Sequence, residues 1–365
     1  MEKHPKDNSY AEVSKRIAAL DYFRAVSIIV IVAGHSFIFM SWQIDMISEK
    51  ILTNVVKGGT SLFVFISGFF LCYRYSKGFQ LIVFMNSKIK FVILPYLVMT
   101  VLTYLFHNWN DIQFLLHQPY LSSMTDALLE HARLLGIYAL NGQISFAYWY
   151  IPFIFCIFLM SPLFLIYSRA NVWLRVILLF VALCVASVVH RPVSNLNVIH
   201  SIVYFTPIYF LGINVGVGWE YFRQPIQKLY LIFGSVALGI ACLQAYFSDV
   251  NGNSHKHVMF AMGSFDYMIW QKAFLSLFLL GLCLKIQHIK FRTLTLFGST
   301  SFAVYFLHAW VLERLSHATI ITSLRPDNSI LAWVYITVVA FGFSLGIAIL
   351  TKRFLGRRSR YFIGY

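Results

Sequence analysis

The sequence predicts an all-α, polytopic membrane protein with about ten transmembrane helices, and its composition is the first reason. Hydrophobic residues make up 59% of the 365 residues, charged residues only 12%, and the mean hydropathy is +0.71. Soluble domains carry about 25% charged residues. Because so few charges cannot cover the chain with polar surface, we expect the lipid bilayer to be its solvent.

The second reason is the length of the apolar runs. A helix that crosses a bilayer needs about 20 mostly apolar residues. Gly58, Gly59 and Gly68 indicate that the second run is bent or tilted. The long segment 108–146 is expected to lie on the outer face of the same membrane as short amphipathic helices. The ten expected spans are 25–42, 59–75, 91–107, 147–168, 172–190, 200–218, 229–247, 265–285, 296–316 and 330–351.

The distribution of the net charge of +15 predicts the topology. With an even number of spans and the N-terminus inside, 21 of the 29 Lys and Arg residues fall in or next to cytoplasmic segments. This asymmetry is the positive-inside pattern, and it is spread over many connectors instead of one stripe, so no nucleic acid is expected as a partner. We therefore expect cytoplasmic tails at 1–24 and 352–365 around a transmembrane domain at 25–351.

The cysteines and histidines indicate no metal site. The five cysteines lie in or at the ends of apolar runs without a CxxC pair, which is typical of small buried hydrophobic residues. His255 and His257 flank Lys256, but no cysteine or carboxylate stands nearby to complete a ligand set.

Four spans are expected to carry polar or aromatic groups at one depth. His35 follows Arg24 by about three helical turns, so the two share a face and lie roughly 16–17 Å apart along the axis. Arg24 then lies at the inner mouth, and His35 lies beyond the midplane with His308, Ser67 and Trp149. Ionisable groups at membrane depth are functional candidates. The structural alternatives are a helix-end anchor, an interhelical hydrogen bond, a helix kink and an interfacial aromatic belt.

Lys88 and Lys90 stand just before the third span, at the predicted inner surface. With Arg24 and Arg74 they can form a phosphate-binding mouth, because guanidinium and ammonium groups bind phosphate oxygens strongly. The alternative is that they act only as positive-inside signals.

These segments together resemble the acyltransferase-3 family of membrane acyltransferases. The resemblance covers nearly the whole chain in order, and it is specific as an ordered set although each motif is loose alone. One departure is that Lys88 and Lys90 stand where the family often has two arginines separated by two residues. The matching segments are AALDYFRAVSIIVIVAGHSF with Arg24 and His35, GTSLFVFISGFFL, KIKFVILPY, FAYWYIPFIF, YFLGINVG and FGSTSFAVYFLHAW.

The resemblance implies transfer of an acyl group from cytoplasmic acyl-CoA to a hydroxyl of a cell-surface polysaccharide or lipid-linked glycan. Acetyl is the group expected first and succinyl the second. The bacterial inner membrane and polysaccharide synthase partners follow from the same resemblance, which is nearest to the stand-alone exopolysaccharide and intercellular-adhesin type of member.

In this hypothesis His35 is the general base or briefly carries the acyl group. His308, Ser67 and Trp149 orient the base or the acceptor, while Arg24, Arg74, Lys88 and Lys90 hold the phosphates of CoA. The alternative is an exporter or flippase for a polysaccharide or lipid-linked sugar, with His35 and His308 as pathway groups.

Overall fold

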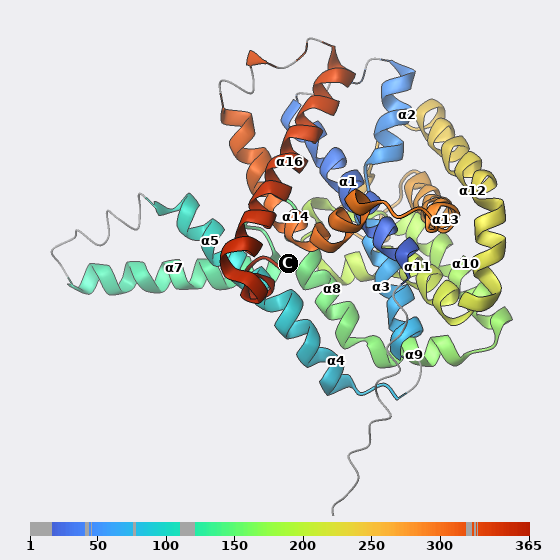
Figure 1. Ribbon diagram of the computed structural model, residues 1–365, viewed down its shortest axis with the longest axis horizontal. Helices are drawn as coiled ribbons and strands as arrows, with labels where there is room; N and C mark the ends of the chain where they lie inside the picture. The colour runs from blue at the N-terminus through green and yellow to red at the C-terminus, as the bar shows by residue number, and fades with distance from the viewer. Residues whose placement is uncertain are drawn as a thin grey trace, which may run out of the picture.

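The fold, taken from a computed structural model, is almost entirely helical (Figure 1). The structure describes residues 17–40, 44, 46–75, 78–109, 121–318, 323–324, 326 and 328–365. Basic residues of the predicted topology that lie outside this part are Lys3, Lys6, Lys15, Arg16, Lys77 and Arg325. The helices are α1 (Ala18–Ser36), α2 (Ile47–Val56), α3 (Thr60–Tyr75), α4 (Leu81–Lys88), α5 (Leu94–His107), α7 (Leu121–Asn141), α8 (Tyr150–Leu159), α9 (Ser161–Arg169), α10 (Val172–Val189), α11 (Val198–Val217), α12 (Trp219–Phe247), α13 (Tyr267–Ile286), α14 (Arg292–His317), α16 (Ser329–Leu355) and α17 (Ser359–Phe362).

Short irregular elements join or extend these helices. They are the 3-10 turns Phe37–Met40, Val193–Asn195 and Gly356–Arg358, the π-helical turn Ile89–Ile93, and the strands β1 (Arg191–Pro192) and β2 (His255–Lys256). The two strands pair in parallel, with Arg191 opposite His255. This pairing joins the α10–α11 connection to the α12–α13 connection.

The prediction of about ten membrane-crossing helices is confirmed. Within the described residues, nine helices or continuous helix pairs are long and apolar enough to cross a membrane, and α8 with α9 forms a tenth that is bent by 58°. The second span starts earlier than predicted, because α2 leads into α3 through a turn at Gly58, whose φ is +77°. Residues other than glycine rarely adopt this backbone conformation.

Both predicted tails are partly helical. The helix α1 begins at Ala18 instead of residue 25, because Ala19, Leu20 and Phe23 continue its apolar face and are buried. At the other end, α16 runs to Leu355, and α17 then folds back against α5. The segment 352–365 is therefore packed against the bundle. The long predicted loop contains α7, which projects from the bundle beside α5 (Figure 1).

The core is formed by helices that cross at very short distances. The helix α1 packs on α14, and α3 packs on α11. Gly212 and Gly216 form a GxxxG pair on α11, and a Cβ atom on Gly216 would lie only 2.6 Å from the carbonyl oxygen of Phe69 on α3. Small residues of this kind let transmembrane helices approach backbone to backbone. The two cavities described next lie at opposite ends of α1 and α3, so these two helix pairs fix the positions of residues that line both cavities.

Candidate active site

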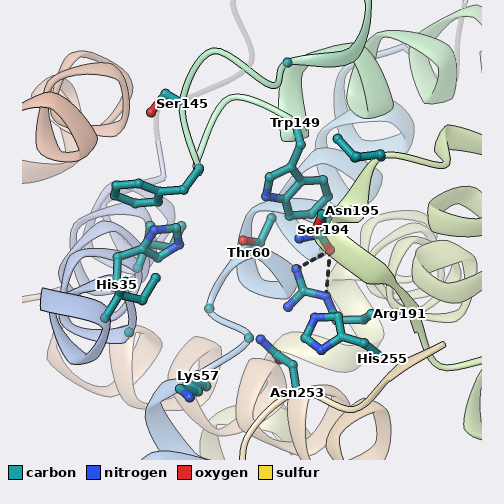
Figure 2. A pocket seen from close by; sticks show the side chains of 18 of the residues that line it. His35, Lys57, Thr60, Ser145, Trp149, Arg191, Ser194, Asn195, Asn253 and His255 are labelled. Atoms are coloured by element: carbon teal, nitrogen blue, oxygen red, sulfur yellow. Dashed lines mark hydrogen bonds between the residues drawn. The ribbon is translucent and has the colours of Figure 1, made fainter. Parts of the chain in front are cut away.

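A cavity of about 620 Å³ lies at the end of the bundle where α1 ends and α3 begins (Figure 2). We call it the His35 cavity. His35 stands on one side of it, and Arg191 and His255 stand on the opposite side, with Trp149 between them along the wall. Its size is in the range of small-molecule sites. It is lined by Ile31, Gly34, His35, Ile38, Lys57, Gly58, Gly59, Thr60, Gly142, Gln143, Ser145, Phe146, Trp149, Arg191, Ser194, Asn195, Leu196, Asn253 and His255.

His35 on α1 and His308 on α14 form a pair of imidazoles. Their ring centroids are 5.2 Å apart in an edge-on arrangement, and His308 is 0% exposed. Nδ1 of His308 lies 3.1 Å from the Val304 carbonyl oxygen, which can only accept, so Nδ1 carries the proton and Nε2 is the acceptor of the neutral ring. Neither His308 Nε2 nor His35 Nδ1 has a hydrogen-bond partner within the described part of the chain. The two histidines, which the sequence placed at a similar depth, are thus neighbours in the structure, and His308 lies outside the cavity lining while His35 lines it.

Arg191 reaches the cavity from β1 and is held in one orientation. Its guanidinium lies 5.2 Å from the Trp149 ring centroid and 5.4 Å from that of Phe205, and its Nε and Nη2 donate to Asn195 Oδ1 at 3.1 and 2.9 Å. Stacking of Arg on aromatic faces is favourable, more so when the ring is desolvated. Trp149 therefore lines the cavity and also holds the Arg191 guanidinium against its ring.

The connection that carries Arg191 is fixed by its neighbour. His190 has a φ of +58°, and its ring nitrogens lie 2.6 Å from Ser254 Oγ and 2.6 Å from the Ser264 carbonyl oxygen. A positive φ in a residue other than glycine is uncommon and persists only where surrounding contacts determine it. These bonds place Arg191 beside His255. Burial, with Arg191 and Lys57 nearby, lowers the pKa of His255 to about 4.

A second cavity, of about 360 Å³, lies at the opposite ends of α1 and α3. We call it the Arg24 cavity. It brings together Arg24, Arg74 and Lys88 as predicted, and it adds Arg360 from α17, which the sequence analysis treated only as a topology signal. The lining residues are Asp21, Arg24, Phe63, Ile66, Ser67, Phe70, Arg74, Tyr75, Ser87, Lys88, Phe91, Val92, Tyr150, Ile154, Phe158, Ser301, Phe302, Tyr305, Arg360 and Gly364.

Aromatic rings and hydroxyls orient the cations of the Arg24 cavity. Arg24 Nη2 donates to Ser301 Oγ at 3.0 Å. Lys88 Nζ lies 4.8 and 4.6 Å from the ring centroids of Phe84 and Phe158. The Arg74 guanidinium carbon lies 4.6 Å from the ring centroid of Phe70. Contact with aromatic rings keeps these cations partly desolvated and fixes their orientation in the cavity.

Two predicted site residues lie elsewhere than the sequence suggested. Ser67 lines the Arg24 cavity and not the cavity of His35 and Trp149, because it stands two helical turns beyond Thr60 on α3. Lys90 is outside the residues that line the Arg24 cavity. Its ammonium lies 5.7 and 5.5 Å from the rings of Phe91 and Tyr361.

A thin wall of rings separates the two cavities. Tyr150 and Tyr305 line the Arg24 cavity with centroids 5.8 Å apart, Tyr305 lies 6.0 Å from His308, and His308 lies 5.2 Å from His35. The Tyr305 hydroxyl donates to the Ala147 carbonyl, which holds this wall to the segment before α8. Within the described residues, the two cavities share no lining residue. The two cavities are therefore separate, and the His35–His308 pair lies between the His35 cavity and the Tyr305 ring that lines the Arg24 cavity.

Metal ligation is not indicated by the arrangement of side chains. Across the part of the chain that the structure describes, no three or more His, Cys, Asp or Glu residues are grouped so that they could hold a metal ion. The cations of the Arg24 cavity are instead suited to phosphate groups.

These features define a multi-pass membrane protein with one polar site on each side of a central wall. The chain belongs to the acyltransferase-3 family: the family model, described as an acyltransferase domain, matches residues 17–353. The matched residues include the whole lining of the His35 cavity, the histidine pair, and the lining of the Arg24 cavity except Arg360 and Gly364.

Curated relatives place the chain in the exopolysaccharide branch of the family. It is 20% identical over 356 residues to a probable poly-beta-1,6-N-acetyl-D-glucosamine export protein of Staphylococcus aureus strain Mu50, covering 92% of this chain and 93% of the relative. The protein of the same description from Staphylococcus epidermidis is 24% identical over 166 residues, or 45% of this chain and 43% of that protein. No solved structure matches the chain at a significant level.

Proposed function

We propose that the protein is a membrane O-acyltransferase that moves an acyl group from cytoplasmic acyl-CoA to a hydroxyl of a cell-surface polysaccharide or lipid-linked glycan. The observation that carries this proposal is the position of the His35–His308 pair between two cavities, one rich in cations and one lined by His35. One site suits a phosphorylated donor and the other suits a hydroxyl acceptor.

The Arg24 cavity is the proposed donor site. Acyl-CoA carries phosphates at one end and a neutral thioester at the other. Arg24, Arg74, Lys88 and Arg360 line the cavity and would bind the phosphates. The pantetheine arm would extend past Ser67 toward Tyr150 and Tyr305, which end the cavity on the side of His308. With this orientation both termini face the cytoplasm, as the positive-inside pattern predicts.

The His35 cavity is the proposed acceptor site. Trp149 and Phe146 offer apolar faces to a sugar ring, and amide and hydroxyl groups such as Asn253 and Thr60 can bind its hydroxyls. His35 is the member of the histidine pair that lines this cavity. It is therefore placed to act on a hydroxyl that enters from the outer side.

The reaction follows from these positions. A nitrogen of neutral His35 takes the proton of the acceptor hydroxyl while the hydroxyl oxygen attacks the thioester carbon. The carbon–sulfur bond then breaks, and the departing sulfur receives the proton from the His35 imidazolium. His308, whose tautomer is fixed by Val304, would hold the His35 ring in place through the edge-on contact between the two rings. In the variant of this mechanism with a covalent intermediate, a His35 nitrogen attacks the thioester carbon, the carbon–sulfur bond breaks, and the departing sulfur takes the proton of the imidazole. The acceptor hydroxyl then attacks the acyl group, the carbon–nitrogen bond breaks, and the hydroxyl proton returns to His35.

The export function named for the relatives is the second candidate. An exporter must pass a whole sugar through the protein, whereas an acyltransferase needs only the thioester end of its donor to reach His35. No continuous cavity joins the two sites in the described structure at the wall of Tyr150, Tyr305 and His308, so these rings would have to move aside slightly for the slim thioester end of a donor and much further for a whole sugar. This difference favours acyl transfer. We place the protein in the bacterial inner membrane, next to a polysaccharide synthase that supplies the acceptor.

The test is the consumption of acyl-CoA by purified protein in nanodiscs. Radiolabelled acetyl-CoA and succinyl-CoA would be supplied with cell-surface glycan, and free CoA and label on glycan would be measured. His35→Ala and His35→Gln should lower CoA release about 10²- to 10⁴-fold, the usual contribution of a general base. His288→Ala, at an exposed position outside both cavities, is the matched control. Full activity in folded His35 variants would refute the proposal, and so would no CoA release by the wild type with its native glycan.

A further inference from the structure

The charges that line the His35 cavity have one sign. Lys57 and Arg191 carry the formal charges, and no aspartate or glutamate is found among the described residues that line it. His255 is neutral near pH 7, because burial and the two cations lower its pKa to about 4. A site for neutral sugar hydroxyls needs no such excess of positive charge. The cavity therefore has a feature that the proposed base and the sugar-stacking rings do not explain.

Arg191 is the cation of this cavity whose side chain is buried and held in place by its neighbours. It is only 5% exposed, it lies against Trp149 and Phe205, and its one hydrogen-bond acceptor in the described structure is the neutral amide oxygen of Asn195. The bonds to Asn195 use Nε and Nη2, which leaves the donors of Nη1 for a ligand. A buried guanidinium without an ionised partner is costly, so an anion in the cavity would stabilise it.

The nearest carboxylate does not supply that partner. Asp266 acts on Arg191 electrostatically, but no carboxylate of the described residues lies within ion-pair distance of the guanidinium. Asp266 Oδ1 instead accepts the N–H of Met268 at the start of α13, and Asp266 does not line the cavity. Lys57 adds a second cation on the same cavity surface.

We propose that Arg191, assisted by Lys57, binds an oxyanion in the His35 cavity, so that the protein selects a substrate carrying a carboxylate or phosphate close to the reacting hydroxyl. This inference rests on the proposed acyl transfer for its biological meaning, but the binding site stands on its own geometry. The oxyanion can belong to the acceptor glycan or to the far end of a dicarboxylic acyl group such as succinyl. The shared chemistry is bidentate or charge-assisted hydrogen bonding to arginine.

The first experiment measures binding without any reaction. Wild-type protein in nanodiscs of zwitterionic lipid would be titrated by calorimetry with methyl β-glucuronide and with methyl β-glucoside, which differ at the carboxylate. We expect the glucuronide to bind at least tenfold more tightly. Equal affinities in the wild type would overturn the inference, and this comparison does not depend on any variant folding.

Variants then assign the preference to Arg191. Arg191→Gln should abolish the preference for the glucuronide, Arg191→Lys should keep part of it, and Lys57→Gln should reduce it by a smaller factor. Arg314→Gln is the matched control, because Arg314 also stacks on a ring, that of Phe106 at 4.1 Å, but lies outside this cavity. Retention of the full preference in folded Arg191→Gln would contradict the assignment.

Steady-state CoA release distinguishes the two sources of the oxyanion. If it belongs to the acceptor, Arg191→Gln raises KM for the glucuronide with acetyl-CoA at least tenfold and spares the reaction of succinyl-CoA with the glucoside. If it belongs to the acyl group, the effects are reversed. Equal losses in both reactions would show a purely structural role and would overturn the inference. Absence of CoA release together with a preserved binding preference would refute acyl transfer and leave the oxyanion site standing.

Discussion

Replacing Gly216 with alanine tests whether the crossing of α3 and α11 holds the Arg24 cavity in shape. A Cβ atom at this position would lie 2.6 Å from the carbonyl oxygen of Phe69 and 3.3 Å from two further backbone atoms of that residue. Backbone cannot rotate away as a flexible side chain can. To reach ordinary contact of about 3.4 Å, the helices must separate locally by about 0.8 Å.

The size of the effect follows from overpacking of a tight interface. Extra methyl groups in a well-packed core typically cost about 1–3 kcal/mol. Because the entropy of unfolding is about 2.1 cal/mol/K per residue, this corresponds for 365 residues to a fall in the unfolding midpoint of roughly 1–4 °C. The helix α3 also carries Ser67 and Arg74 into the Arg24 cavity, so acyl-CoA binding should weaken in the same variant.

The assay is thermal unfolding in detergent, followed with a thiol-reactive dye. Cys72 on α3 and Cys283 on α13 are buried and become reactive only when the bundle opens. Gly346→Ala is the matched control, because Gly346 is also in a membrane helix but no atom lies within 4 Å of its Cβ position. It should leave the midpoint unchanged or raise it slightly, since alanine restricts the unfolded chain more than glycine does. Equal midpoints for Gly216→Ala and the wild type would refute the reasoning.

Three further predictions concern single buried groups. His308→Gln should lower CoA release about 10- to 100-fold without changing acyl-CoA affinity, because His308 contacts His35 and not the donor; a changed affinity would contradict this. Burial raises the pKa of Asp266 to about 6, so its contribution to stability is full below about pH 4 and is lost as the pH rises through 6. Asp266→Asn should therefore gain about 3 kcal/mol relative to the wild type between pH 3 and pH 8, about half of it above pH 5, and a pH-independent difference in the unfolding midpoint would exclude this. Lys272→Met should cost about 1–3 kcal/mol in the same measurement, because its ammonium donates to two backbone carbonyls at the end of α2, whereas Lys256→Met on an exposed ammonium should cost less.

The membrane architecture could be predicted from sequence because it depends on local composition. Each span is an apolar run of the length that a bilayer requires, and the ten predicted runs correspond to the nine helices and one bent pair found in the described residues. The ends were less predictable. Asp21 and Arg24 led to a predicted boundary at residue 25, although the apolar face of α1 starts at Ala18.

The cavities could be predicted only in part, because their residues meet through packing of distant helices. Arg24, Arg74 and Lys88 were found by their position near the inner ends of spans, and His35 and His308 by their depth. Arg191 was not found, since its role depends on Trp149 and Phe205 closing around it from α8 and α11. The only local signal of Arg191 was a basic residue in the short, polar connection His190–Asn197. This connection is predicted to lie outside, where the positive-inside rule expects few basic residues.

Arg360 illustrates the same limit at the other end of the chain. In the sequence it is one of five basic residues after the last span, and nothing separates it from the other four. In the structure α17 turns it into the Arg24 cavity, where its guanidinium lies 3.7 Å from the Phe91 ring centroid. A chain reversal after α16 has no periodic signal, so only the folded arrangement reveals this cation.

The charges on the two sides of the wall also predict which acyl group the protein would prefer under the proposed acyl transfer. Cations line both cavities, but the groups between them, Tyr150, Tyr305 and His308, are uncharged rings or hydroxyls that give a carboxylate no ionised partner. A neutral acyl group can reach His35 through this wall, whereas the carboxylate of a succinyl group must lose its hydration on the way at a large cost in free energy. We expect kcat/KM to be higher for acetyl-CoA and propionyl-CoA than for succinyl-CoA, with propionyl-CoA as the control because its acyl group is the succinyl group without the carboxylate. A rate for succinyl-CoA above that for propionyl-CoA would refute this reasoning, and it would identify the acyl group as the source of the oxyanion that Arg191 binds.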